Sequence, residues 1–274
     1  MKRLILGFSL ILYLGLSLSC QAQAISPYKT DWVKDGAITA AGIGMTIVGS
    51  TILLNKDRLT EADLQTISTT DVNKFDRFAA GNYSASAEHA SDFPFYSSFV
   101  APLFLLLDDD VRLQAPQVYL LYAQAMSITG GLFSMTAGLT ERKRPSVYAT
   151  DAPLEARLHK YATNSFFAGH TAATATATFF AAKVFHDFNP DSPARHFVWA
   201  AAAITPATVG YLRLRAGKHF LTDNIIGYTL GAGIGILVPH LHKKNNTTGL
   251  SISPAIIPTS VESSFQGANL SYTF

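Results

Sequence analysis

The sequence is poor in cysteine and in charge. Cys20 is the only cysteine among 274 residues, so no intramolecular disulfide can form. Charged residues make up 15% of the chain, against about 25% in typical soluble domains, while hydrophobic residues make up 48%. The formal net charge is only +2, which gives no argument for nucleic acid as a partner. The composition excludes a disulfide scaffold and indicates an apolar protein.

The first 24 residues have the features of a secretory signal peptide. Lys2 and Arg3 precede an apolar stretch over 4–18, which is short for a membrane-spanning helix. Ala22 and Ala24 then frame a cleavage site of the small-x-small kind. A signal of this form predicts export to a bacterial cell envelope.

The remaining chain consists of apolar runs, which proline and asparagine residues separate. The runs cover residues 37–54, 95–107, 115–139, 165–185, 196–212 and 223–241. We therefore expect an all-α, multi-helix bundle with about six apolar helices. The predicted parts are a signal peptide at 1–24, a helical domain at 25–243 and a β-strand tail at 244–274.

The C-terminal tail has a different pattern from the runs. Apolar and polar residues alternate over 250–252 and 268–274, which is typical of strands. We predict a short β-hairpin packed on the bundle. The alternative is contact of the tail, 249–274, with another envelope protein by strand addition.

The segment with the most chemical information contains Arg213, His219 and Asp223. If a helix begins at His219, the i, i+4 spacing stacks the Asp223 carboxylate beside the imidazole. A carboxylate in that place fixes the histidine tautomer and stabilises an imidazolium. Arg213 offers a planar fork of donors to an oxyanion. These groups suit nucleophilic attack on phosphorus.

Two further segments accompany this one. Arg144-Pro145 ends the third apolar run, and Gly169-His170 begins the fourth. Arg213 ends the fifth run, and the sixth begins shortly after it. In an antiparallel bundle these four run ends share one side, so we expect the motifs to meet there.

In order, the three segments resemble the signature of the type 2 phosphatidic acid phosphatase superfamily, which also contains vanadium haloperoxidases and bacterial class A acid phosphatases. That signature reads Lys-x6-Arg-Pro, then Pro-Ser-Gly-His, then Ser-Arg-x5-His-x3-Asp. The resemblance covers about residues 115–240. It implies a helical hydrolase of phosphoric monoesters.

The resemblance also implies roles for single residues. His219 would be the nucleophile that forms a phosphohistidine, and Asp223 would orient and polarise it. His170 would protonate the leaving oxygen and then activate water. Arg144 and Arg213 would hold the non-bridging phosphate oxygens. This divides one difficult displacement into two easier ones.

Gly169 would allow close approach of its backbone N–H to the phosphate, because it has no side chain. Two arginines and polar donors replace a metal ion in this scheme. The resemblance therefore implies neither a metal nor a cofactor.

The chain departs from the family signature at several positions. Ala137 stands where the family has lysine, Phe167 and Ala168 replace the Pro-Ser pair, and Leu212 replaces the last serine. A cationic contact and a hydroxyl donor to phosphate are therefore missing. Each lost donor would cost on the order of 2–4 kcal/mol of transition-state stabilisation.

Other residues are candidates to replace these contacts. Arg142 or Lys143 would supply the lost charge to the phosphate. Ser165, Thr171 or Lys218 would supply the lost donor.

The apolar helices favour a phosphorylated lipid as substrate, such as phosphatidic acid, an isoprenoid phosphate or the phosphate of lipid A. A small soluble phosphomonoester stays open. Two rival functions also stay open: a vanadate-dependent haloperoxidase, and a non-catalytic envelope scaffold with the same fold.

Topology follows from the signal peptide. After cleavage, six simple spans would place the motifs inside, whereas related envelope phosphatases act outside. Either one early run does not span or the domain rests on a membrane. We expect a membrane-associated protein whose site faces the periplasm.

Overall fold

The computed structural model describes residues 26–244, together with the backbone of 251–260 and 263–271. The predicted signal peptide and Cys20 lie outside these residues. The long helices are α2 (Trp32–Leu54), α4 (Ala85–Ser98), α6 (Ala115–Leu139), α8 (Gly169–Phe188), α9 (Ala194–Arg215) and α10 (Leu221–Leu241). Shorter helices are α3 (Glu61–Thr66), α5 (Asp109–Leu113) and α7 (Leu154–Arg157), with 3-10 turns η1 (Thr69–Asp71), η2 (Arg77–Ala79), η3 (Ala101–Leu107) and η4 (Pro145–Tyr148). The prediction of an all-α bundle is confirmed.

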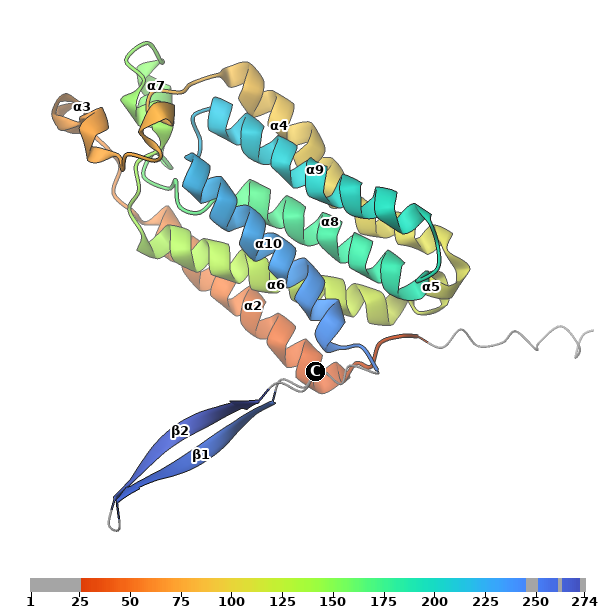
Figure 1. Ribbon diagram of the computed structural model, residues 1–274. Coiled ribbons are helices and arrows are strands. Elements are labelled where there is room, and N and C mark those ends of the chain that lie inside the picture. Colours follow the sequence, from red (N-terminus) through yellow and green to blue (C-terminus); the bar gives the residue numbers. More distant parts are fainter. Residues whose placement is uncertain (1–25, 245–250, 261–262, 272–274) are drawn as a thin grey trace, which may run out of the picture.

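Helix α8 is the centre of the bundle. It packs against α4, α6, α9 and α10, while α2 packs on the outer side of α6 (Figure 1). Half of the residues of α8 are alanine or threonine, and twelve of its residues are buried. Small side chains let the neighbouring helices approach closely. A Cβ atom on Gly231 of α10 would come within 2.1 Å of the Ala172 carbonyl oxygen, so only glycine fits there.

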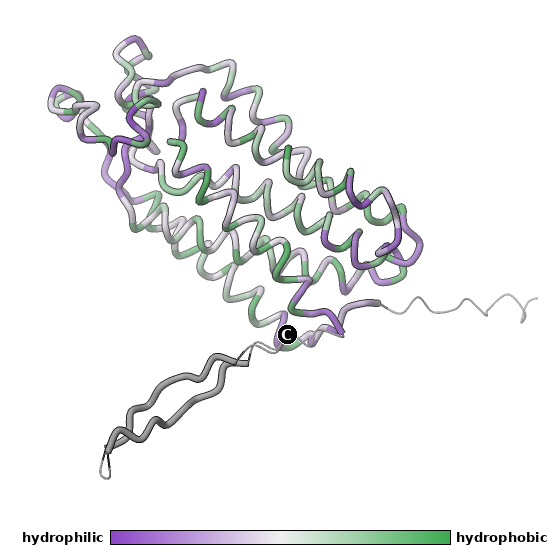
Figure 2. The backbone as a smooth tube through the Cα atoms, viewed as in Figure 1, coloured by the Kyte–Doolittle hydropathy of each residue, from purple (hydrophilic) through white to green (hydrophobic). Residues whose placement is uncertain are grey.

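Within the described residues, four segments are long and apolar enough to cross a membrane: Trp32–Leu54, Ala85–Leu107, Ala194–Arg215 and Leu221–Leu241. The hydropathy colours of Figure 2 show apolar residues along these helices and polar residues gathered in the connections at both ends of the bundle. Large apolar side chains of α2 face outward, since Trp32 and Ile47 are both 62% exposed. Length and exposed apolar surface together support association with a membrane.

The second apolar run differs from its predicted bounds of 95–107. The helix begins ten residues earlier, at Ala85, where the Ser84 hydroxyl accepts a hydrogen bond from the Ala87 N–H at 3.2 Å. Residues Ala101–Leu107 form a 3-10 helix. The early polar turns of α4 hid its start, because they face the other helices near the site and lack an apolar period.

The segments β1 (Ser251–Ser260) and β2 (Ser263–Ser271) are antiparallel neighbours. The packing of a hairpin tail on the bundle stays a prediction.

The structure places the helix ends that carry the motifs together, as the sequence predicted. Helix α6 ends, α8 begins, α9 ends and α10 begins at the same end of the bundle, beside α3 and α7 (Figure 1). The connections that carry Arg144, His170, Arg213 and His219 therefore lie together.

Candidate active site

His219 lies in the connection between α9 and α10 and is 2% exposed. Its Nδ1 atom is 2.7 Å from the carbonyl oxygen of Ser165. A carbonyl oxygen only accepts hydrogen bonds, so Nδ1 carries the proton and Nε2 keeps its lone pair. Burial, followed by the charges of Arg213 and Arg144, lowers the pKa of His219 well below its usual value. The imidazole is therefore neutral at neutral pH and has a nucleophilic nitrogen.

His170 is the second residue of α8 and belongs to the same charge cluster. Its ring packs on the Phe95 ring of α4, with 4.2 Å between centroids. Burial, then Arg213, Arg144 and Lys218, lowers the pKa of His170 to about 3. Since the same two arginines act on both histidines, the four predicted residues converge on one place.

Arg213, which is buried, and Arg144, which is half-buried, bring donors to this cluster. Arg213 is 5% exposed, and its Nη1 atom is 3.5 Å from the Ser91 hydroxyl oxygen. Its Nε atom is buried and has no hydrogen-bond partner in the part of the chain that the structure describes. Arg144 donates from Nε to the Asn164 carbonyl oxygen at 3.4 Å, and burial and Arg213 lower its pKa to about 10. Neither arginine forms an ion pair within residues 26–244.

Lys218 is a third cation at this place. Its Nζ atom is 2.7 Å from Glu88 Oε1 of α4. Burial lowers the pKa of Lys218, Glu88 raises it, and the two arginines lower it further. Three cations with a single ion-paired carboxylate leave an excess of positive charge, which suits a phosphate anion.

Asp223 does not contact the imidazole as the sequence predicted. Its carboxylate accepts hydrogen bonds from the Ser165 hydroxyl at 2.6 Å and the Phe220 N–H at 2.8 Å, and it pairs with Arg142. The physical reason is that α10 begins at Leu221, so His219 lies before the helix and the i, i+4 rule does not apply. Asp223 acts on His219 indirectly, because it fixes the serine whose carbonyl binds Nδ1.

Arg142 also has a different place from the predicted one. Its guanidinium pairs with Asp223 and with Asp76, the latter at 2.6 Å, and lies 4.7 Å from the centroid of the Phe220 ring. Both carboxylates are fully buried. Arg142 therefore neutralises two buried carboxylates, and its guanidinium donors are occupied by Asp76 and Asp223.

Lys143 lines a separate polar hollow of 340 Å³ together with Asp71, Glu141 and Tyr148. Of the two candidates for the lost positive charge, Arg142 is thus engaged with Asp76 and Asp223, and Lys143 lines this hollow. Lys218, the candidate for the lost hydroxyl donor, is a cation that acts on His170.

Gly169 begins α8, and its missing side chain has a packing reason. A Cβ atom there would come within 2.6 Å of the Phe133 ring. The other two donor candidates are engaged elsewhere, since the Ser165 hydroxyl binds Asp223 and the Thr171 hydroxyl donates to Asn224 Oδ1 at 2.8 Å.

Several residues that contact the site precede the motifs in the chain, and no pattern in the sequence indicated them. Glu88, Ser91 and Phe95 follow one face of α4 at helical spacing and cover the histidines and arginines. Asp76 reaches the site from the connection between α3 and α4. Spacing along the chain cannot show such contacts, because they depend on how α4 packs across α8 and α9.

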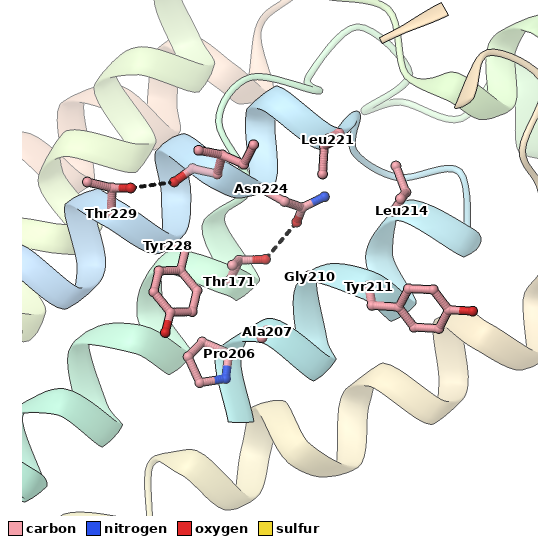
Figure 3. A pocket seen from close by; sticks show the side chains of 11 residues that line it. Thr171, Pro206, Ala207, Gly210, Tyr211, Leu214, Leu221, Asn224, Tyr228 and Thr229 are labelled. Atoms are coloured by element: carbon pink, nitrogen blue, oxygen red, sulfur yellow. Dashed lines mark hydrogen bonds between the residues drawn. The ribbon is translucent and has the colours of Figure 1, made fainter. Parts of the chain in front are cut away.

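An apolar groove lies between α9 and α10. It has a volume of 370 Å³, with Thr171 of α8 at its base (Figure 3). Its walls include Leu214 and Leu221, and Tyr211 and Ile225 are 57% and 49% exposed. The histidines and arginines of the cluster do not line this groove, although Thr171 and Leu214 directly follow His170 and Arg213 in the chain.

No group of three or more histidine, cysteine, aspartate or glutamate side chains within the described residues is arranged to hold a metal ion.

Residues 118–247 match the family model of the PAP2 superfamily, the type 2 phosphatidic acid phosphatases. The predicted resemblance to the PAP2 superfamily is confirmed over this segment. No curated protein matches the chain. Among solved structures, it is similar to a transmembrane PAP2 type phosphatidylglycerolphosphate phosphatase from Bacillus subtilis, with 17% identity and a TM-score of 0.41, over 90% of this chain and 99% of that one. The PAP2 motif residues His170, Arg213 and His219 all lie inside the matched range.

The ion-pair role of Arg142 can be tested by Arg142→Ala. We expect the free energy of unfolding to fall by about 3–5 kcal/mol, because two buried carboxylates lose their counter-charge. Arg112→Ala is the control, since Arg112 pairs with Asp109 at the surface, and it should cost less than about 0.5 kcal/mol. Unfolding in detergent, followed by circular dichroism, measures both. A stable Arg142→Ala protein that has lost phosphate affinity would instead restore the phosphate-binding role.

The lowered pKa of His170 predicts a pH dependence of stability. The unfolded chain binds a proton near pH 6.5, whereas folded His170 binds one only near pH 3. Stability is therefore fully present above pH 6.5 and falls as the pH is lowered towards 3.

His170→Gln removes this titration. Burial raises the pKa of Asp223 to about 6, so Asp223 also titrates between pH 6.5 and 5, but it does so in both proteins. In this window the wild-type stability should therefore fall more steeply than that of the variant, by up to about 1.4 kcal/mol per pH unit. Unfolding free energies at four pH values measure the difference. Parallel curves would show that His170 is not held neutral by the fold.

Proposed function

We propose that this protein is a phosphatase that hydrolyses a lipid-linked phosphate monoester through a phosphohistidine on His219. The observation that carries the proposal is the placement of two neutral histidines, His219 buried and His170 half-buried, against three cations, with the Arg213 Nε donor unpaired in the described part of the chain. The PAP2 family of the helical core supports the same activity.

The first chemical step follows from the proton positions. Nε2 of His219 attacks phosphorus while the bond to the leaving oxygen breaks, and the proton on Nδ1 stays against the Ser165 carbonyl. Arg213 and Arg144 neutralise charge on the non-bridging oxygens. Lys218 serves as the third cation, in place of the lysine that the family has at Ala137.

His170 completes both steps as acid and base. Phosphate charge offsets the arginines that lower the pKa of His170, so the arriving substrate favours the protonated imidazole. His170 gives this proton to the leaving oxygen. It then takes one from water, which attacks phosphorus and releases His219.

The apolar groove between α9 and α10 supports a lipid as the leaving group. Its walls are apolar and open at the surface next to Tyr211, which suits an acyl or isoprenoid chain whose phosphate lies at His219. We infer a membrane-associated enzyme, exported and with its site facing the periplasm. Contact with another envelope protein through 249–274 belongs to the same proposal.

His219→Ala tests the nucleophile. Release of phosphate from p-nitrophenyl phosphate and from phosphatidic acid should fall by about three orders of magnitude or more, and His170→Ala should cost about 100-fold or more. His196→Ala is the control, because His196 is exposed at the start of α9. Full activity of His219→Ala would refute the mechanism. Halide oxidation by the vanadate-loaded wild type, without phosphate release, would favour the haloperoxidase.

Ala207→Trp tests the groove. Ala207 is exposed on the groove wall, so an indole there should block an acyl chain. The KM for a long-chain phosphatidic acid should rise about tenfold or more, with hydrolysis of p-nitrophenyl phosphate unchanged. Ala200→Trp, two helical turns earlier on α9, is the control. Equal effects on both substrates would contradict a lipid-chain groove.

A further inference from the structure

A second lysine, Lys56, lies against the end of α6 near Ala137, where the family has its lysine. Lys56 directly follows the C-cap of α2, and its ammonium lies at the end of α6. Its Nζ atom donates to the carbonyl oxygens of Ala137 at 3.1 Å and Thr140 at 2.6 Å, and to Asn164 Oδ1 at 2.8 Å. An ammonium has three protons, so these acceptors use all of them. Lys56 has none left for a phosphate.

Lys56 therefore acts through Asn164, which is 4% exposed. Every polar group of this residue except one has a partner. The backbone N–H donates to the Tyr161 carbonyl at 3.0 Å, the backbone carbonyl accepts from Arg144 Nε, and Oδ1 accepts from Lys56. The amide nitrogen Nδ2 is buried and has no partner among the described residues. The lysine also fixes the amide orientation, because an ammonium bonds only to the oxygen.

The unpaired amide belongs to the segment that builds the site. Asn164 contacts Arg144 through its own carbonyl, and the next residue, Ser165, contacts His219 through its carbonyl. Within the described residues, the buried nitrogen donors without partners are Asn164 Nδ2 and Arg213 Nε. Buried N–H groups are rarely left unpaired, so two of them around one cation cluster indicate a shared acceptor.

We propose that Asn164 Nδ2 donates a hydrogen bond to a phosphate oxygen, and that Lys56 is the positioning residue that aims it. The inference rests on the proposed phosphatase function and names a further donor for it. The side-chain amide takes over the contact that the family serine makes at the position of Ala168 here, and Lys56 keeps a positive charge at the end of α6.

Asn164→Asp is the sharpest test, since it changes one donor into an acceptor and keeps the oxygen that Lys56 binds. Binding of inorganic phosphate to the full-length protein in detergent, measured by calorimetry, should weaken at least tenfold. The kcat/KM for p-nitrophenyl phosphate should fall about 100-fold or more. Asn55→Asp is the matched control, because it adds the same charge on the exposed C-cap beside Lys56. It should leave both measurements within twofold.

The role of Lys56 is tested by coupling. Lys56→Met should lower kcat/KM about tenfold in the wild type and have little further effect in Asn164→Ala, because the lysine acts through the amide. Lys56→Arg should recover most of the loss. Circular dichroism and the thermal midpoint separate these effects from failure to fold.

The outcomes distinguish the two proposals. If the wild type hydrolyses substrate and Asn164→Asp keeps both phosphate affinity and kcat/KM within twofold, the inference is wrong and the phosphatase stands. If the wild type binds phosphate but does not hydrolyse esters, and Asn164→Asp loses binding, the inference stands and the phosphatase is wrong. A wild type that neither binds nor hydrolyses overturns both.

Discussion

The buried carboxylate of Asp223 is the interaction on which the site depends. It ties the Ser165 hydroxyl, the start of α10 and the Arg142 guanidinium together, so three connections from distant parts of the chain share one anchor. A charge with no exposure requires such partners. The carbonyl of Ser165 is thereby held against His219 Nδ1, which fixes the tautomer of the imidazole. The imidazole of His219 is thus oriented by a backbone group.

Around this anchor, the cations form two layers with different tasks. Arg142 and Lys56 are saturated by protein acceptors and hold the framework. Arg144, Arg213 and Lys218 lie with the histidines, lower their pKa values and leave positive charge uncompensated. Repulsion between uncompensated cations destabilises the empty site, and binding of an anion such as phosphate relieves that repulsion. The central helix α8 supports this cation cluster, because its small residues let the neighbouring helices pack tightly against it.

The sequence predicted the helical bundle because the apolar runs are long and proline marks their ends. It also predicted that Arg144, His170, Arg213 and His219 meet, since run ends in an antiparallel bundle alternate between two sides. It failed for Asp223 and Arg142. Helical spacing was applied across a helix start at Leu221, and a basic residue beside a motif was assigned to the ligand when buried carboxylates were its partners.

The sequence by itself determined the fold class, because helices follow from local periodicity. Its motif spacing determined the resemblance to the PAP2 superfamily and singled out the two histidines and two arginines that lie together. Only the tertiary structure decided which groups touch. Lys56, Glu88 and Asp76 approach the site from outside the motifs, across contacts that no spacing encodes. The hydrogen-bond partner of His219 and the unpaired amide of Asn164 depend on how the connections pack, and packing is a property of the whole bundle.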